Sequence, residues 1–238
     1  MKIFCNIFLF VLFLGVVFFS CKKDKVIVPS TDFGYNYFPN DVGHYVIYQV
    51  DSIGRDDLSN HHDSTRYLLK ELIAATFLDN ANRPTLRIER YYQFYHFSTH
   101  TWDTAWSVPK VWTANRTQTT LEKKEENITY LKLVFPVKQD KQWNGNTYNA
   151  LGDKEYQITS VDQHETINAL SFDSVATVTQ FQKKDIIDTI DEAEKYARNI
   201  GLIYKKRDSL YFSYSSITQN YSDAVGYRFT QKIISYGK

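Results

Sequence analysis

The stretch "LRIERYYQFYHF", residues 86–97, decides the fold class. Five of its side chains recur with a period of two: Leu86, Ile88, Tyr92, Phe94 and His96. Arg90 interrupts this row at the one remaining position. A period of two puts alternate side chains on one face of an extended chain. We therefore predict a strand here, with one face turned towards a core.

The sequence before this stretch predicts a partner strand. Residues 44–51, "HYVIYQVD", have strand composition, and residues 52–64, "SIGRDDLSNHHDS", have the composition of a loop. Residues 65–80, "TRYLLKELIAATFLDN", carry apolar side chains at helical spacing but run into the turn-rich "DNANRP". A hairpin with residues 86–97 is favoured, and segment 66–78 stays open between helix and strand.

Further strand-like runs follow along the rest of the chain. Strand-like runs are "KVWTANRT" (110–117), "NITYLKLVFP" (127–136), "KEYQITSV" (154–161), "FDSVATVTQF" (172–181), 202–205 and 228–235. Asn144-Gly145 predicts a tight turn. Good helix formers gather only in Asp191 to Arg198, so segment 186–199 is also open. With 18 Tyr and 16 Phe, the composition favours strands. We predict a mainly β, single antiparallel domain with at most one or two short helices.

The first 25 residues predict export. Lys2 precedes an apolar run from Ile3 to Phe19, which is the layout of a secretory signal. Ser20-Cys21 resembles the lipobox of bacterial lipoproteins, with Phe18 and Phe19 in place of its usual residues, and "SCKKD" is similar to lipoproteins of Bacteroidota. The alternative is an uncleaved anchor helix with a buried cysteine. We predict a signal peptide at 1–20, a lipidated N-terminus and tether at 21–34, and one domain at 35–238.

The lipobox resemblance implies that Cys21 carries acyl chains such as palmitate. Several such chains hold a domain on a membrane almost irreversibly. We expect the cell envelope, and within it the outer membrane, with the side of attachment open. Cys21 would be the only cysteine of the mature chain, which excludes an internal disulfide and a thiolate metal site. Loss of Lys2 brings the net charge from +1 to about zero, so we expect no nucleic-acid partner.

Two further segments carry a resemblance. "YFPNDVGHYVIYQVDSI" (37–53) and "YARNIGLIYKK" (196–206) are similar to signatures of small uncharacterised Bacteroidota lipoproteins, a family that implies no activity. The second segment also resembles hairpins of lipoprotein-carrier-like half-barrels. That likeness implies a curved sheet or half-barrel around an apolar hollow.

One short pattern exceeds chance. Asp, then Ser or Thr, then an apolar residue or Thr occurs six times, against roughly one expected from the residue frequencies. The pattern resembles the acceptor motif of protein O-glycosylation in Bacteroidota. The alternative is that these residues mark strand ends by bonding local backbone groups. The implied acceptor hydroxyls are those of Ser52, Ser64, Thr104, Ser174, Thr189 and Ser209.

Metal and catalytic motifs are not indicated. His96 and His100, like the pair His61-His62, have no third ligand at a recognised spacing, so we predict no metal and no cofactor. The motifs of serine hydrolases, zinc proteases and phosphate loops do not occur. Glu125-Glu126 lies in "EKKEEN" (122–127), which we expect to be a solvated strand end or loop. We predict no catalytic residue and a protein that is not an enzyme.

Three tryptophans are the candidate ligand surface. Trp102, Trp106 and Trp112 gather within "THTWDTAWSVPKVW" (99–112). Exposed tryptophans stack on sugars or apolar ligands, whereas packing within the core is the alternative. The sequence therefore favours a membrane-anchored binding domain for an apolar ligand, a glycan or an envelope protein. A structural subunit of an envelope complex is the runner-up and a hydrolase of envelope polymers comes third; the oligomeric state is open. An aromatic-walled pocket would favour the first, and a flat apolar patch the second.

Overall fold

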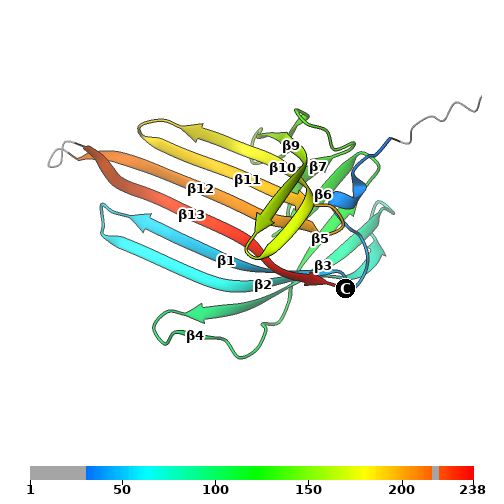
Figure 1. Ribbon diagram of the computed structural model, residues 1–238, viewed down its shortest axis with the longest axis horizontal. Coiled ribbons are helices and arrows are strands. Elements are labelled where there is room, and N and C mark those ends of the chain that lie inside the picture. Colours follow the sequence, from blue (N-terminus) through cyan, green and yellow to red (C-terminus); the bar gives the residue numbers. More distant parts are fainter. Residues whose placement is uncertain (1–30, 216–219) are drawn as a thin grey trace, which may run out of the picture. The chain divides into compact units, whose positions relative to one another are not determined.

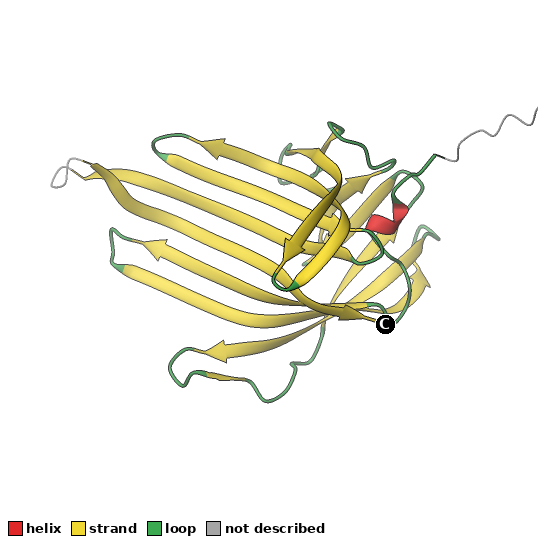
Figure 2. Cartoon of the chain, viewed as in Figure 1, coloured by secondary structure: helices red, strands yellow, loops and turns green. Residues whose placement is uncertain are grey.

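The computed structural model describes residues 31–215 and 220–238. A compact unit spans Phe33–Lys238. Its helical part is one short 3-10 turn, η1 (Tyr35–Tyr37), and thirteen strands make up most of the rest (Figures 1 and 2). The strands are β1 (Tyr45–Asp56), β2 (His61–Leu78), β3 (Pro84–His96), β4 (Thr101–Trp102), β5 (Lys110–Arg116), β6 (Thr120–Glu125), β7 (Ile128–Val134), β8 (Gln142–Asn144), β9 (Glu155–Ile167), β10 (Leu170–Lys184), β11 (Asp188–Ala197), β12 (Gly201–Ser215) and β13 (Asn220–Gly237).

All thirteen strands belong to one antiparallel sheet. Its order is β7-β6-β5-β3-β2-β1-β13-β12-β11-β10-β9-β8, and β4 pairs with β3 beside this path. The sheet curls until its two edges meet. At that seam the Leu131 amide of β7 donates to the carbonyl of Gly145 just after β8, at 2.9 Å. Trp143 Nε1 also donates to the Leu131 carbonyl, at 2.8 Å. The predicted antiparallel, curved β domain is thus confirmed, and the sheet is nearly closed as a barrel.

The core fills the inner face of the curled sheet. Alternate residues of β1, beginning with Val46, Tyr48 and Val50, are buried, because alternate side chains of a strand share a face. They pack with Leu69 of β2 and Ile233 of β13 in one cluster. A second cluster packs on the far wall, around Leu133, Tyr156, Ile158 and Val178.

One end of the hollow is closed by the two signature segments. His44 Nε2 lies 2.9 Å from the Ile200 carbonyl, and Tyr48 donates its hydroxyl to the Leu202 carbonyl at 2.9 Å. The Asn199 amide donates to the carbonyl of Asn36, at 2.7 Å. Segments 37–53 and 196–206, far apart in the sequence, therefore form one contact.

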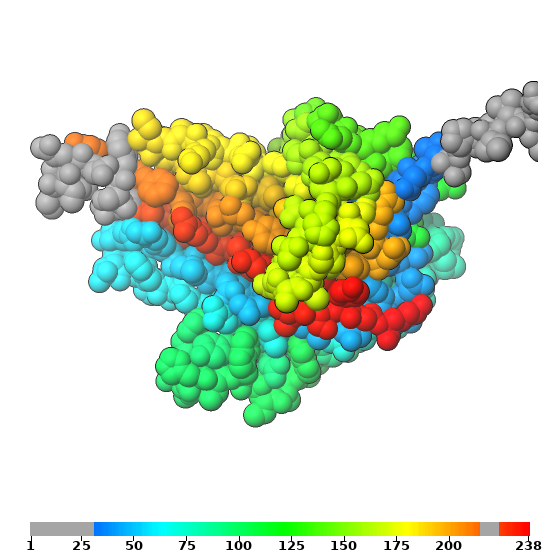
Figure 3. All heavy atoms as spheres, in the orientation of Figure 1, coloured from blue at the N-terminus to red at the C-terminus, as the bar shows by residue number. Residues whose placement is uncertain are grey.

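A hairpin packs across the outer side of β13. In Figure 3 the β9–β10 hairpin lies against the C-terminal end of β13. Asn168, at its tip, donates Nδ2 to the Ile233 carbonyl at 2.7 Å, and the rings of Phe172 and Tyr236 lie 6.4 Å apart. The described residues contain no helix with the length and apolar character needed to cross a membrane.

One expectation about local structure is wrong. Residues 52–64 are not a loop, because β1 continues to Asp56 and β2 begins at His61, with only a short turn between them. Segment 186–199, left open between helix and strand, contains β11, of which residues 191–197 form most. That strand is paired on both sides, by β10 and β12, so backbone pairing overrides the helix propensity of its residues.

The other open choice, segment 66–78, is also a strand. Residues 66–78 lie within β2, which pairs with β3 across a turn at residues 79–83, as the hairpin prediction required. A turn also follows Asn144 as predicted, although β9 begins only at Glu155. Gly145 is required at this turn, because a Cβ there would lie 2.3 Å from the Tyr156 ring.

Candidate ligand-binding site

An open cleft of about 540 Å³ lies on the inner face of the sheet, beyond the buried core. Val50 is fully buried, and Ser52, two residues on, continues the same face into the cleft. Its cross-strand partner is Phe229 of β13, while Val50 pairs with Tyr67 of β2 and Gln231 of β13. The cleft therefore forms where the inward row of these strands stops meeting the opposite wall.

Charged side chains make the floor of this cleft. We give the name charged belt to seven charged residues that line the cleft or the smaller cavity behind it: Glu71, Arg90, Lys123, Glu125, Lys132, Glu194 and Lys205. They come from β2, β3, β6, β7, β11 and β12, so the belt encircles the hollow. Three of the seven line both the cleft and the smaller cavity behind it: Glu71, Lys123 and Glu125. Arg90 and Lys205 line only the cleft, and Lys132 and Glu194 line only the cavity.

The belt divides into two groups of ion pairs. In the first, Glu71 accepts from Arg90 Nε at 2.8 Å and from Lys123 Nζ at 3.1 Å. In the second, Lys132 Nζ lies 3.0 Å from Glu194 Oε1 and 3.2 Å from Glu125 Oε1. Lys205 Nζ adds a contact of 3.2 Å to Glu194. Each carboxylate thus has two cationic partners, which a buried charge requires.

These contacts keep the carboxylates ionised. Burial alone would raise the pKa of Glu125, but the nearby ammonium groups of Lys132 and Lys205 lower it to about 2. Burial likewise opposes ionisation of Glu194 and Glu71, yet the same kind of cationic contact holds the pKa of each below its usual range. Burial lowers the pKa of Lys205. The three belt carboxylates are therefore anions at neutral pH and have no proton to donate.

Aromatic rings form the walls of the cleft. The lining includes Tyr67, Trp112, Tyr130, Tyr227 and Phe229. The Arg90 guanidinium lies 3.4 Å from the centre of the Trp112 ring, and Lys132 Nζ lies 5.0 Å from that of Tyr130. Such cation–π contacts hold the rings against the charged floor. The cleft thus offers flat apolar faces next to fixed charges.

The hollow behind the belt is nearly filled. The cavity there encloses only about 50 Å³, between Pro39, Tyr48, Ile88 and Leu202. A water molecule occupies about 30 Å³ in the liquid, and a pocket for a drug-sized ligand measures roughly 300 Å³ or more. The apolar hollow that the half-barrel likeness implied is therefore packed with side chains.

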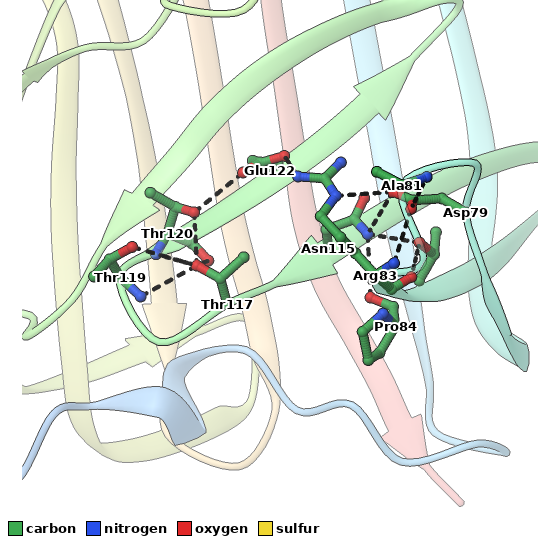
Figure 4. Close-up of polar contacts among 10 residues, drawn as sticks. Asp79, Ala81, Arg83, Pro84, Asn115, Thr117, Thr119, Thr120 and Glu122 are labelled. Carbon is green, nitrogen blue, oxygen red and sulfur yellow. Dashed lines mark hydrogen bonds and ion pairs between the residues drawn. The ribbon is translucent and has the colours of Figure 1, made fainter.

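A second open cleft, of about 600 Å³, lies at the turn between β2 and β3. Figure 4 shows its polar contacts: Arg83 lies between Asp79, which accepts from Nε at 2.9 Å, and Glu122, which accepts from Nη1 at 2.9 Å. Asn115 donates Nδ2 to the carbonyl of Pro84 at 3.1 Å. These groups form hydrogen bonds and ion pairs with one another, and the contacts stabilise the turn between β2 and β3.

The three predicted tryptophans do not form one surface. Trp112 lines both clefts and is half-buried. Trp102 lies instead on β4, with its ring 5.0 Å from Tyr95, and Trp106 is exposed in the following loop. Only Trp112 therefore belongs to the candidate site.

The predicted acceptor hydroxyls are scattered over the sheet. Ser64 and Thr104 are exposed, and the others are half-buried. Ser52 faces into the cleft, and Thr189 and Ser209 lie on β11 and β12. Ser174 is bonded on three sides, by Asp162, by Tyr37 at 3.2 Å and by Arg198 Nε at 2.9 Å. Glycosylation stays a prediction at each of them.

The remaining predicted residues lie outside the site. His96 pairs with Asp103 at 2.7 Å, His61 with Asp63 at 2.8 Å, and His62 with Asp57 at 3.0 Å. Tyr95 is the hydrogen-bond partner of His100. Within residues 31–215 and 220–238, no three metal-ligating side chains come together. Cys21 and the signal segment lie outside the described residues.

The expectation for "EKKEEN" is wrong. Lys123 is buried and Glu125 is part of the charged belt, whereas Glu126 is exposed. The signal that could have revealed this is alternation: Leu121, Lys123 and Glu125 have the spacing of one strand face, and Leu121 is apolar. Arg90 gave the same signal, because it sits in an inward row of apolar residues.

Comparisons with known proteins add a distant likeness. No family model matches the chain, and no curated protein matches it. Two solved structures resemble it: a protein described as exported, with a YmcC-like fold, from Bacteroides fragilis, and a protein described as a lipoprotein from Parabacteroides distasonis. Each is 11% identical and spans 87% of this chain and 100% of its own, with TM-scores of 0.39 and 0.38. At these values nothing about this chain's activity follows from them.

Proposed function

We propose that this protein is a lipid-anchored protein of the bacterial envelope whose curved sheet binds a glycan in the open cleft. The observation that carries the proposal is the cleft of about 540 Å³, with aromatic rings on its walls and charged groups on its floor. Sugars present apolar faces to aromatic rings and hydroxyl groups to polar side chains. A concave site with aromatic walls and a few fixed polar groups is the usual form of a ligand site.

The cleft fits a glycan better than an apolar ligand. An apolar molecule would have to cover the ionised belt, and burying charge against an apolar group costs several kcal/mol. The cavity on the apolar side of the belt, about 50 Å³, is too small for one. A glycan hydroxyl can instead bond to the carboxylates and ammonium groups already present.

A role in binding without catalysis is part of the proposal. Hydrolysis of a glycosidic bond uses one carboxylic acid with a raised pKa as proton donor. Here the pKa of Glu125 lies at about 2, and those of Glu71 and Glu194 are also lowered. The carboxylates share their cationic partners, and such a network of ion pairs suits a rigid polar floor of the cleft that binds a ligand without reacting with it.

One surface favours the alternative of an assembly subunit. Phe97 and Trp102 are exposed beside Tyr95, whose ring lies 5.1 Å from Phe97. Arg66 lies 5.9 Å from the ring centres of both Tyr95 and Phe97. Aromatic side chains and Arg are enriched at protein interfaces. This favours the hairpin of β3 and β4 as a docking surface for an envelope protein.

The test begins with the full chain purified from its native membrane. Intact mass should show a chain that starts at an acylated Cys21. The protein should then bind a subset of an envelope-polysaccharide array, and Phe229→Leu and Tyr67→Leu should each weaken that binding roughly tenfold, because each removes an aromatic face. Tyr148→Leu is the matched control, since Tyr148 is exposed and lines neither cleft.

Three results would count against the proposal. A chain that starts at Met1 would contradict the lipid anchor. Equal binding by the cleft variants and the Tyr148 control would move the site elsewhere. Loss of partner capture in a Trp102→Ala variant, with no glycan bound by the wild type, would favour the assembly role.

A further inference from the structure

A second cavity, of about 240 Å³, adjoins the candidate cleft. We call it the polar chamber. It lies between β7, β11 and β12 and the segment after β8, and it shares four lining residues with the cleft: Glu125, Tyr130, Lys205 and Arg207. A ligand in the cleft can therefore reach into the chamber.

Gln180 of β10 brings an unused hydrogen-bond donor to this chamber. The residue is 3% exposed and lines the cavity, and its Nε2 has no hydrogen-bond partner among the described residues 31–215 and 220–238. A buried donor without a partner costs free energy, and most buried polar groups in proteins are bonded. An unsatisfied amide in a cavity is therefore a place where a ligand acceptor belongs.

Two β-bulges direct side chains into the chamber. Gln180 is skipped in the pairing of β10 with β11, where Thr179 pairs with Ala193 and Phe181 with Glu192. Lys132 is skipped in the pairing of β7 with β6, where Leu131 pairs with Glu122 and Leu133 with Leu121. Bulges re-aim side chains and are frequent beside binding sites.

Positive charge exceeds negative charge around the chamber. Four cations line it: Lys132, Lys154, Lys205 and Arg207. They share three carboxylates: Glu125, Glu192 and Glu194. Lys154 pairs with Glu192, so Arg207 Nε lies at a loose 3.8 Å from that same carboxylate. Within this set the cations exceed the carboxylates by one, and the most loosely paired cation is Arg207, whose side chain is 47% exposed.

We infer that the polar chamber binds an anionic oxygen group of the ligand, a carboxylate, sulfate or phosphate, through Gln180 Nε2 and the surplus cation of the Lys205–Arg207 side. The inference rests on the proposed function and narrows it to acidic glycans. An anion would neutralise the surplus charge and accept the unused amide hydrogen. A hydroxyl group of a neutral sugar can accept the amide hydrogen but cannot neutralise the positive charge.

The experiment compares wild type with Gln180→Leu in the full chain held in detergent. The first arm measures the thermal unfolding midpoint against sodium phosphate, sulfate and acetate, with chloride at equal ionic strength as reference. The second arm measures binding of oligogalacturonate, oligomannuronate and hyaluronan oligomers, each beside its carboxyl-reduced neutral form. Gln182→Leu, exposed on the same strand, is the matched control.

We expect at least one of the three anions to raise the midpoint of the wild type and of the Gln182 variant but not that of Gln180→Leu. At least one acidic oligosaccharide should bind about tenfold more tightly than its neutral form, and Gln180→Leu should lose that preference. Without ligand the variant should be no less stable than wild type, because an unpaired buried amide has been removed. Gln180→Met serves if the Leu variant does not fold.

The possible failures are distinct. Equal binding of acidic and neutral oligosaccharides, with no anion effect, would overturn the inference and leave the proposed glycan site standing. An anion effect that depends on Gln180, with no oligosaccharide bound, would keep the anion site and overturn the glycan function. Identical responses of wild type and Gln180→Leu to every probe would show that Gln180 Nε2 does not bind the anionic group, and would overturn the inference.

Discussion

Lys132 occupies the position between two buried carboxylates. Its side chain is 5% exposed, that of Glu194 is 1% exposed, and Nζ contacts both Glu194 and Glu125. Burial would lower the pKa of Lys132, but the two carboxylates raise it well above its usual range. The lysine is therefore charged at any ordinary pH, and its removal takes from both buried carboxylates a close cationic partner, while Lys205 stays near them.

We expect Lys132→Met to lower the free energy of unfolding by about 3 kcal/mol, since it uncovers buried charge. Urea denaturation followed by tryptophan fluorescence gives the value. The matched control is Lys110→Met. Lys110 makes an exposed contact of 3.9 Å with Glu126, and such pairs contribute about 0–1 kcal/mol. Equal effects of the two substitutions would contradict a buried belt.

At the residue scale, the sequence shows the period of two of a strand, but it does not show why a charged residue stands in an apolar row. Arg90 interrupts an apolar row, and the interruption was visible in residues 86–97. Its partner Glu71 lies on a neighbouring strand, 19 positions away, so no local pattern connects them. Glu125 and Glu194 are likewise brought together by the curl of the sheet, because β6 and β11 are not neighbours.

The β12–β13 hairpin depends on one glycine in an extended conformation with positive φ. Gly226 has φ +143°, and a Cβ there would lie 1.9 Å from the Ser209 carbonyl oxygen. It pairs with Leu210 of β12 and with Arg55 of β1, so the contact lies within the sheet. Only glycine avoids this collision with backbone.

Gly226→Ala should lower the free energy of unfolding by about 2–4 kcal/mol. The added Cβ would clash with backbone atoms, which cannot move away as a flexible side chain can. The paired control on the next strand is Gly54→Ala, where the nearest atom is Asp63 Cβ at 3.6 Å, an ordinary contact. Chemical denaturation of both variants checks this. A Gly226 variant as stable as the Gly54 variant would refute the backbone explanation.

At the element scale, the long runs were predictable and the exceptions have physical causes. Residues 52–64 looked like a loop because Gly, Asp, Asn and Ser are typical of turns, yet cross-strand pairing extends β1 to Asp56. Residues 191–197 looked helical because Ala, Glu and Lys favour helices. Each residue from 191 to 197 is instead paired on two sides, which a propensity of a few tenths of a kcal/mol per residue does not outweigh.

At the scale of the whole molecule, three ionised carboxylates lie in the interior, those of Glu71, Glu125 and Glu194, so acid should unfold the protein. The folded pKa of Glu125, about 2, lies below the ordinary value for glutamate, about 4.3. The stability that this carboxylate contributes is therefore complete above pH ~5 and is lost as the pH falls towards 2. Glu71 and Glu194, with pKa values shifted in the same direction, act alike.

We expect the free energy of unfolding to be nearly constant from pH 7 to about 5.5 and to fall steeply between pH ~5 and ~2. Glu125→Gln should be less stable than wild type at pH 7 and should lose less on acidification. Its neighbour supplies the control: Glu126→Gln should follow the wild-type profile, since Glu126 is exposed. Unfolding curves at six or more pH values measure the slope, and a flat profile would contradict an ionised interior.

The sequence by itself was enough to predict a mainly β, antiparallel domain. The reason is that a period of two in side-chain polarity is a local property, visible in neighbouring residues. The sequence also carries the export and lipidation pattern at Cys21, which stays a prediction. Only the tertiary structure decided which charges lie inside, that the hollow is packed and that a cleft remains beside it. The physical reason is that ion pairs such as Lys132–Glu194 join strands that become close only when the sheet curls.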